Sequence, residues 1–344
     1  MNNVQNQQRL IYLDFLRAFA TIAVVIFHYD LTGNIKLSEI INISLDWCVP
    51  VFLMITGALF FNTSREITEL TMLKKTIPRI VGIIVIWGGV YNIVSVVAIE
   101  GLSIHSALKA FFMIVKADTT YCYQFWYLYF IIGIYFLIPI IKPWVDKHMN
   151  HEKPTIEASV VYLLILVVGI IIPSVFKILN YSGGFWHNAF RVYYGLAFYP
   201  LCGCWLSKWY LDRRIRRCLL ITWFIQLLVL LLNVFFAFID NSENYYGYTS
   251  IFTWETAILL FDFVRRIDFS KCNGKLLQFI CSFSNKSLGI YIFHAMILWI
   301  MYKVVSFVDR FSVFPMLIIV GTTIIICMVI TTIAKRIPFV NKLV

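Results

Sequence analysis

Three ionisable residues, Asp14, Arg17 and His28, lie along the first long apolar segment of the sequence. Ionisable groups are costly inside a bilayer, and those found there usually serve a function. In a helix, Asp14 and Arg17 are three residues apart and can pair. Arg17 and His28 are eleven positions apart, about three turns, so they share one face with roughly 16 Å between them along the axis. This face offers a cation and, further along, a histidine suited to acid–base chemistry.

The composition places these residues in a membrane protein. Of the 344 residues, 60% are hydrophobic and only 14% are charged, and the mean hydropathy is +0.81. These values are typical of an all-α, polytopic integral membrane protein. We expect a single transmembrane domain over residues 1–344, with no appended soluble domain.

The hydrophobic pattern predicts about ten transmembrane helices. Most basic residues fall in loops on one side of these segments, which indicates that both termini are cytoplasmic. The net charge of +11 therefore reflects membrane orientation, and we expect no nucleic-acid partner. The predicted spans are 10–29, 45–62, 79–99, 124–141, 158–177, 189–207, 218–239, 249–264, 287–306 and 313–334.

Segments outside the predicted spans have two expected roles. Residues 70–80 and 275–284 are amphipathic, and we expect them to form interfacial helices on the cytoplasmic side. The polar outer segments 30–43, 100–123 and 239–248 are long enough to carry residues that recognise a second substrate.

A second histidine, His294, lies in the middle of the ninth predicted span. It is seven residues after Ser287 and three after Tyr291, so the three side chains share a helix face. They could form a second polar wall of the same site as His28. Alternatively, His294 makes an ordinary hydrogen bond between helices. The residue types do not decide between these interpretations.

Other polar and aromatic residues of the spans have a structural alternative. Glu255 and Asp262 lie seven residues apart on one face, where they could orient a histidine, pair with Arg191 or neutralise a buried charge. Trp126 opens the fourth span, where an aromatic belt at the membrane surface would also explain it. The eight cysteines show no metal-ligand spacing, so no metal is expected, and a disulfide between Cys48 and Cys122 could form near the outer face.

At these residues the chain resembles acyltransferase family 3, in particular the O-acetyltransferases of bacterial surface polysaccharides such as the one that modifies enterobacterial common antigen. The most specific feature is Arg17 and His28 separated by ten residues and preceded by Asp14. One departure is Gln124, where the family pattern leads us to expect a histidine, and we assign it no role. The other similar segments are Val49-Pro-Val-Phe-Leu-Met-Ile-Thr-Gly57, Lys74-Lys-Thr-Ile-Pro-Arg79, Phe125-Trp-Tyr-Leu128, Ser287-Leu-Gly-Ile-Tyr-Ile-Phe-His294 and Ile337-Pro-Phe-Val340.

The resemblance implies a membrane-bound O-acyltransferase. Its donor would be an acyl-CoA, most simply acetyl-CoA, used as a co-substrate with no bound cofactor. Its acceptor would be a hydroxyl of a cell-envelope glycan or a lipid-linked precursor, and membrane lipids would surround it. An envelope-modifying role indicates a bacterial cytoplasmic (inner) membrane. The resemblance leaves open whether the donor is acetyl-CoA or succinyl-CoA, and it does not indicate an oligomeric state.

The implied site combines residues from several spans. His28 would act as the general base or carry the acyl group itself, with Arg17 and Asp14 as further catalytic residues. CoA is polyanionic and should bind on the basic cytoplasmic side. The residues expected to bind substrates are Arg79, Lys74, Lys75, Trp126, Tyr291, His294 and Glu255.

Two other classes of protein could use ionisable residues in membrane spans, or tolerate them. A transporter or flippase of a polysaccharide precursor would use them for substrate or proton passage. The sequence shows no paired halves with matching interrupted helices, which such folds often have. A membrane sensor or scaffold would not need groups as costly as Asp14, Arg17 and His28 on one face.

Overall fold

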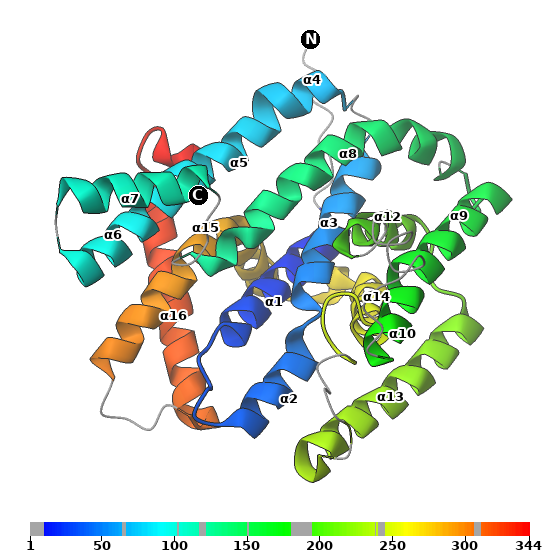
Figure 1. Ribbon diagram of the computed structural model, residues 1–344. Coiled ribbons are helices and arrows are strands. Elements are labelled where there is room, and N and C mark those ends of the chain that lie inside the picture. The colour runs from blue at the N-terminus through cyan, green and yellow to red at the C-terminus, as the bar shows by residue number, and fades with distance from the viewer. Residues whose placement is uncertain are drawn as a thin grey trace. The chain divides into compact units, whose positions relative to one another are not determined.

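The computed structural model describes residues 10–63, 67–101, 103–116, 122–149, 151–179, 195–237, 239, 245–305 and 311–344. Within these ranges the regular secondary structure is helical, and no strand occurs (Figure 1). The all-α fold predicted from the sequence is therefore confirmed. In chain order the helices are α1 (Ile11–Phe27), α2 (Ile35–Leu45), α3 (Cys48–Phe61), α4 (Glu69–Thr71), η1 (Met72–Thr76), α5 (Ile77–Ile83), η2 (Ile84–Gly88), α6 (Gly89–Glu100), α7 (Ile104–Val115), η3 (Tyr123–Phe125), α8 (Trp126–Met149), α9 (Ile156–Leu166), η4 (Val167–Ile171), α10 (Ile172–Ile178), η6 (Leu196–Phe198), α12 (Tyr199–Lys208), α13 (Arg213–Phe236), α14 (Ile251–Arg265), η8 (Phe269–Lys271), α15 (Gly274–Val304), α16 (Val313–Ala334) and η9 (Val340–Lys342).

Seven helices of the described chain are long and apolar enough to cross a membrane. They identify a multi-pass membrane protein, as the composition predicted. These helices are Ile35–Phe61, Glu69–Ala98, Tyr123–Met149, Ile156–Ile178, Arg213–Phe236, Gly274–Val304 and Val313–Ala334.

The other three predicted spans contain shorter helices. Helix α1 has 17 residues, which corresponds to about 26 Å at 1.5 Å per residue. Helix α14 has 15 residues, or about 22 Å. Helix α12 has 10 residues, and residues 189–194 of the predicted span lie outside the described chain.

Two segments expected outside the spans are parts of long helices. The predicted interfacial segment 275–284 continues directly into the ninth span, and together they form the 31-residue helix α15. The predicted interfacial segment 70–80 is likewise part of the continuous helix Glu69–Ala98. A 31-residue helix is about 46 Å long, so α15 exceeds the ~30 Å hydrocarbon core and has room for polar residues at its ends.

The outer segments are also partly helical. Residues 35–45, within and beyond the expected polar segment 30–43, form α2. Residues 104–115 form α7, which packs along α6 (Figure 1). The sequence pattern underestimated both helices because their apolar residues are interrupted by isolated polar ones.

The chain divides into two compact units, each assembled from segments distant in sequence. Unit 1 contains Met1–Val24, Glu39–Ala58 and Leu164–Ser287. Unit 2 contains Val25–Ser38, Leu59–Leu163 and Leu288–Val344. Helices α1 and α15 each contribute residues to both units, because the divisions after Val24 and Ser287 fall inside them.

Two glycines allow backbones to touch within unit 1. A Cβ atom on Gly57 of α3 would lie 1.8 Å from the carbonyl oxygen of Pro200, on α12. A Cβ atom on Gly203 of α12 would lie 1.8 Å from the carbonyl oxygen of Met54, on α3. Small residues at such crossings let membrane helices pack at short range.

We therefore expect Gly203→Ala to destabilise the protein by about 2–3 kcal/mol, because the added methyl group meets backbone that must move. The measurement is the free energy of unfolding in detergent. Gly133→Ala is the matched control, since a Cβ atom on Gly133 of α8 meets nothing within 4 Å. A Gly203→Ala protein as stable as the Gly133→Ala protein would contradict the close α3–α12 contact.

Candidate active site

A buried carboxylate, Asp14, lies at the centre of a polar cluster in unit 1, on helices α1 and α15. The hydroxyl of Ser284 donates to Asp14 Oδ1 at 2.6 Å, and the thiol of Cys281 lies 3.8 Å from Asp14 Oδ2. Arg17 Nη1 lies 3.8 Å from Asp14 Oδ1 and donates to Ser284 Oγ at 3.4 Å. The ion pair expected from the three-residue spacing is therefore present. We call Asp14, Arg17, Cys281 and Ser284 the Asp14 cluster.

Asp14→Asn should destabilise the protein, because Asp14 is only 6% exposed and its charge faces the Arg17 guanidinium. A hydrogen bond to a charged group contributes about 1.5–3 kcal/mol, and we expect a loss in that range in detergent unfolding experiments. Ser284→Ala, which removes the donor of this bond instead, should also cost about 1.5–3 kcal/mol. Additive losses in the double variant would contradict a direct interaction between Asp14 and Ser284.

Two histidines meet in unit 2. His294 Nε2 lies 3.3 Å from His28 Nδ1, and the ring centroids are 5.0 Å apart. His294 is fully buried, whereas His28 is half-buried. The other ring nitrogen of His294, Nδ1, lies 2.7 Å from the backbone carbonyl oxygen of Tyr291. Two residues that are 266 positions apart in the sequence thus form one hydrogen-bonded pair.

The hydrogen-bond chemistry decides which ring nitrogen of each histidine carries the proton. A carbonyl oxygen only accepts, so His294 Nδ1 must carry the proton that it donates to Tyr291. In neutral His294, Nε2 is then an acceptor, and His28 Nδ1 must donate to it. Neutral His28 therefore has its lone pair on Nε2. A histidine fixed in this tautomer by a second group is arranged as a general base.

Residues of the turn before α8 contact His28 and Tyr291. The Tyr123 ring, at the exposed surface, lies 5.2 Å from the His28 ring. The hydroxyl of Tyr291 donates to the backbone carbonyl of Gln124. Residues of the 3₁₀ helix η3 are thereby attached to both histidine-bearing segments. We call His28, Tyr123, Gln124, Tyr291 and His294 the His28 cluster.

A buried tyrosine fixes the backbone of α15 on both sides of His294. The hydroxyl of Tyr91 donates to the carbonyl of Ile292 at 2.7 Å and accepts from the N–H of Met296 at 3.1 Å. Tyr91 is 5% exposed, and its ring contacts that of Phe125 with centroids 5.6 Å apart. These contacts hold α15 and the η3 turn together around the His28 cluster.

The basic residues expected to bind CoA lie at a different part of unit 2. Lys74 and Lys75 are exposed on η1. Arg79 donates from Nε to the carbonyl of Lys342 at 2.6 Å. Trp87 donates to the carbonyl of Leu343 at 3.2 Å, so the C-terminal segment packs on this surface.

The two remaining residues expected to bind substrate have local contacts. Glu255 of α14 is buried in unit 1 and accepts hydrogen bonds from Thr222 at 2.8 Å and from Gln226 at 2.6 Å. Both of its carboxylate oxygens thus tie α14 to α13. Its suggested partner Arg191 lies outside the described residues. Trp126 is half-buried at the start of α8, with its ring centroid 6.3 Å from that of Tyr127.

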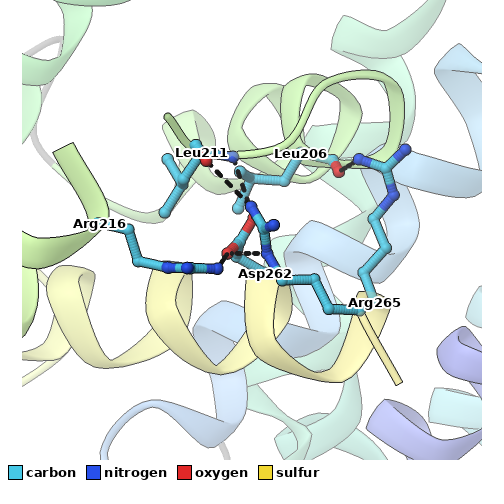
Figure 2. A network of polar contacts seen from close by, with 6 residues as sticks. Leu206, Leu211, Arg216, Asp262 and Arg265 are labelled. Carbon is cyan, nitrogen blue, oxygen red and sulfur yellow. Dashed lines mark hydrogen bonds and ion pairs between the residues drawn. The ribbon is translucent and has the colours of Figure 1, made fainter. Parts of the chain in front are cut away.

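Asp262 joins three segments of unit 1 (Figure 2). Its carboxylate accepts from Arg266 Nε at 2.7 Å and from the backbone N–H of Leu211 at 3.0 Å, and it lies 3.9 Å from Arg216. The hydrogen bonds that Arg266 donates to the Asp262 carboxylate raise the pKa of Arg266 above its ordinary value. The side chain of Arg265 does not contact Asp262 but donates a hydrogen bond to the carbonyl of Leu206 (Figure 2). The sequence left three roles open for Asp262. These contacts match the structural role, the neutralisation of a buried charge.

The cysteines of the described chain are thiols, and Cys48 and Cys122 are not joined by a disulfide. Within the described residues, no group of three His, Cys, Asp or Glu side chains is arranged to hold a metal ion.

Sequence reasoning found both histidines and the Asp14–Arg17 pair but missed four residues of the two clusters, Cys281, Ser284, Tyr123 and Gln124. Ser284 and Tyr123 carry side-chain chemistry that is common in ordinary helices and turns, so nothing in the sequence marked them. Gln124 was noticed only as a departure from the family pattern. Its position inside the His28 cluster depends on the fold.

Seven helices of the described chain that are long and apolar enough to cross a membrane define a multi-pass membrane protein, and its described residues include a hydrogen-bonded histidine pair. The sequence profile of acyltransferase family 3, described as an acyltransferase domain, matches residues 10–332. The chain therefore belongs to this family and is an acyltransferase. Searches of curated proteins and of solved structures found no match, so the likeness to the enterobacterial common antigen enzyme stays an expectation.

Proposed function

We propose that the protein transfers an acetyl group from acetyl-CoA to a hydroxyl of a cell-envelope glycan or its lipid-linked precursor. The observation that carries the proposal is the chain of hydrogen bonds from Tyr291 through His294 to His28. This chain leaves the lone pair of His28 on Nε2, where it can accept a proton from an attacking hydroxyl. Membership of an acyltransferase family supports this reaction class.

The reaction can be written with a single proton carrier. The acceptor hydroxyl oxygen attacks the thioester carbonyl carbon, and His28 Nε2 takes the hydroxyl proton. The tetrahedral intermediate then expels the CoA sulfur, the C–S bond breaks, and the proton on His28 Nε2 passes to the leaving thiolate. The positive charge that His28 carries in between is shared with neutral His294, which accepts the hydrogen bond from Nδ1.

The donor is assigned to the cytoplasmic side, with both termini on that side and the protein in the bacterial inner membrane. Exposed Lys74 and Lys75 offer charge to the CoA phosphates, and Arg79 extends this surface. Arg17, which pairs with Asp14 and donates to Ser284, is proposed as a further catalytic residue. The attacking hydroxyl of the acceptor is neutral, so a base that takes its proton makes it a better nucleophile.

The test is the release of CoA thiol by the purified protein in lipid vesicles. Acetyl-CoA and succinyl-CoA are supplied in separate reactions, each with and without an extract of bacterial envelope polysaccharide. We expect rapid thiol release only with acetyl-CoA and the extract together. Preference for succinyl-CoA would overturn the choice of donor. Absence of thiol release with every donor, together with transport of the glycan across the vesicle membrane, would support the transporter alternative.

A further inference from the structure

The side-chain amide of Gln124 is buried without satisfying its hydrogen-bonding capacity. Gln124 is 1% exposed, and within the described chain neither its Nε2 nor its Oε1 has a hydrogen-bond partner. Buried polar side chains of native proteins nearly always have partners, and an exception calls for a ligand, a water or a catalytic role. The amide thus offers an unused donor and an unused acceptor.

The backbone of Gln124 is fixed within the His28 cluster. Its carbonyl accepts the hydroxyl of Tyr291, whose own carbonyl binds His294. The preceding residue, Tyr123, places its ring against that of His28. The following residue, Phe125, stacks on Tyr291 with ring centroids 6.4 Å apart. The backbone that carries the orphaned amide is therefore held in the same cluster as the proposed base.

The two orphaned atoms restrict which ligand can satisfy them. The carbonyl of a thioester only accepts, so it would leave Gln124 Oε1 without a donor. The secondary amides of the pantetheine arm are trans, with N–H and C=O on opposite edges, so one such group cannot reach both atoms of Gln124. Neighbouring hydroxyls on a sugar ring can do both, because each hydroxyl donates one hydrogen bond and accepts others.

We propose that Gln124 binds the sugar acceptor, donating from Nε2 to one hydroxyl and accepting at Oε1 from its neighbour, and so places the reacting hydroxyl at His28. This inference rests on the proposed acyl transfer and names the part of the site that recognises the acceptor. Other orphaned atoms of the described chain lack this combination. Thr253 and Thr323 each contribute one hydroxyl without a partner, and Trp254 contributes one N–H, so none of them offers a separate donor and acceptor as Gln124 does.

The experiment compares wild type with Gln124→Met, which has a similar shape but no amide. The probe is the envelope polysaccharide extract, with acetyl-CoA as donor, and the readouts are kcat, the KM for the extract and the Kd for acetyl-CoA. We expect kcat/KM for the extract to fall about 10- to 100-fold, since two hydrogen bonds are lost. The Kd for acetyl-CoA should stay within about twofold of wild type. Thr253→Val, which removes a buried orphaned hydroxyl on α14 in unit 1, should leave all three readouts unchanged.

Gln124→Asn is the second variant, because it keeps the polar group and withdraws it by one methylene. If Gln124→Met does not fold, Gln124→Asn should still show the loss in kcat/KM. Values of kcat/KM within twofold of wild type, or an equal weakening of acetyl-CoA binding, would overturn the inference and leave water as the partner of the amide. A wild-type protein without CoA release would instead overturn the proposed function, and this inference with it.

Discussion

His28→Ala is expected to lower the rate of acetyl transfer by about 10²- to 10⁴-fold, the usual contribution of a general base. The Kd for acetyl-CoA should change little, because the imidazole acts on the acceptor proton and not on the CoA phosphates. The measurement is single-turnover transfer to the polysaccharide extract by protein in vesicles, with acetyl-CoA binding measured on the same samples. The loss should be confined to the chemical step.

The matched control is His151→Ala, which replaces an exposed histidine after α8 whose Nε2 lies 3.0 Å from the backbone carbonyl of Lys147. It removes the same group from a position outside the His28 cluster and should retain wild-type activity. A His28→Ala protein that is folded, binds acetyl-CoA and transfers at the wild-type rate would contradict the site assignment. Acetyl label recovered on His28 itself in quenched wild-type reactions would show a covalent carrier in place of a base.

Two substitutions of His294 should distinguish its role in orienting His28 from a role in filling space. His294→Leu removes the acceptor that receives the His28 Nδ1 proton, so the lone pair of His28 is no longer fixed on Nε2. We expect transfer to fall by about 10²- to 10⁴-fold, as when the orienting group of a catalytic histidine is lost. His294→Gln has a side-chain oxygen that can accept from His28 Nδ1, and it should retain activity within about tenfold of wild type.

The measurement for this pair is kcat as a function of pH, together with the melting temperature. If His294 only fills space, Leu should support activity at least as well as Gln, and the order of the two variants would be reversed. Equal activity of both variants at equal stability would likewise contradict an orienting role. The loss in His294→Leu should persist at every pH, because it concerns the tautomer of neutral His28.

The helical fold was predictable because hydrophobic runs of membrane length have few structural alternatives. The local pairing of Asp14 with Arg17 was predictable for a similar reason, since a helix fixes which residues share a face. The boundaries of the helices were harder to predict from the sequence. The amphipathic pattern at 275–284 indicated a separate interfacial helix, but α15 runs without a break from Gly274 to Val304. Ser284 and Cys281 in this part of α15 contact Asp14, which the pattern could not show.

The centre of the site could not be derived from the sequence. His28 and His294 were each identified as candidates, but their direct contact joins residues 266 positions apart. Their protonation pattern depends on the carbonyl of Tyr291, a group that every residue has. Glu255 shows the opposite case, because an acidic residue in an apolar span indicated function, and the fold pairs both oxygens with Thr222 and Gln226.

The most direct test of the account follows an isotope-labelled acetyl group from acetyl-CoA to the glycan. Purified wild-type and His28→Ala proteins in vesicles receive labelled acetyl-CoA and the envelope polysaccharide extract, and the glycan is then analysed for label that mild base removes as acetate. The account predicts base-labile label on the glycan with wild type and almost none with His28→Ala, at equal binding of acetyl-CoA. Glycan that crosses the vesicle membrane without label, or equal labelling by both proteins, would contradict it.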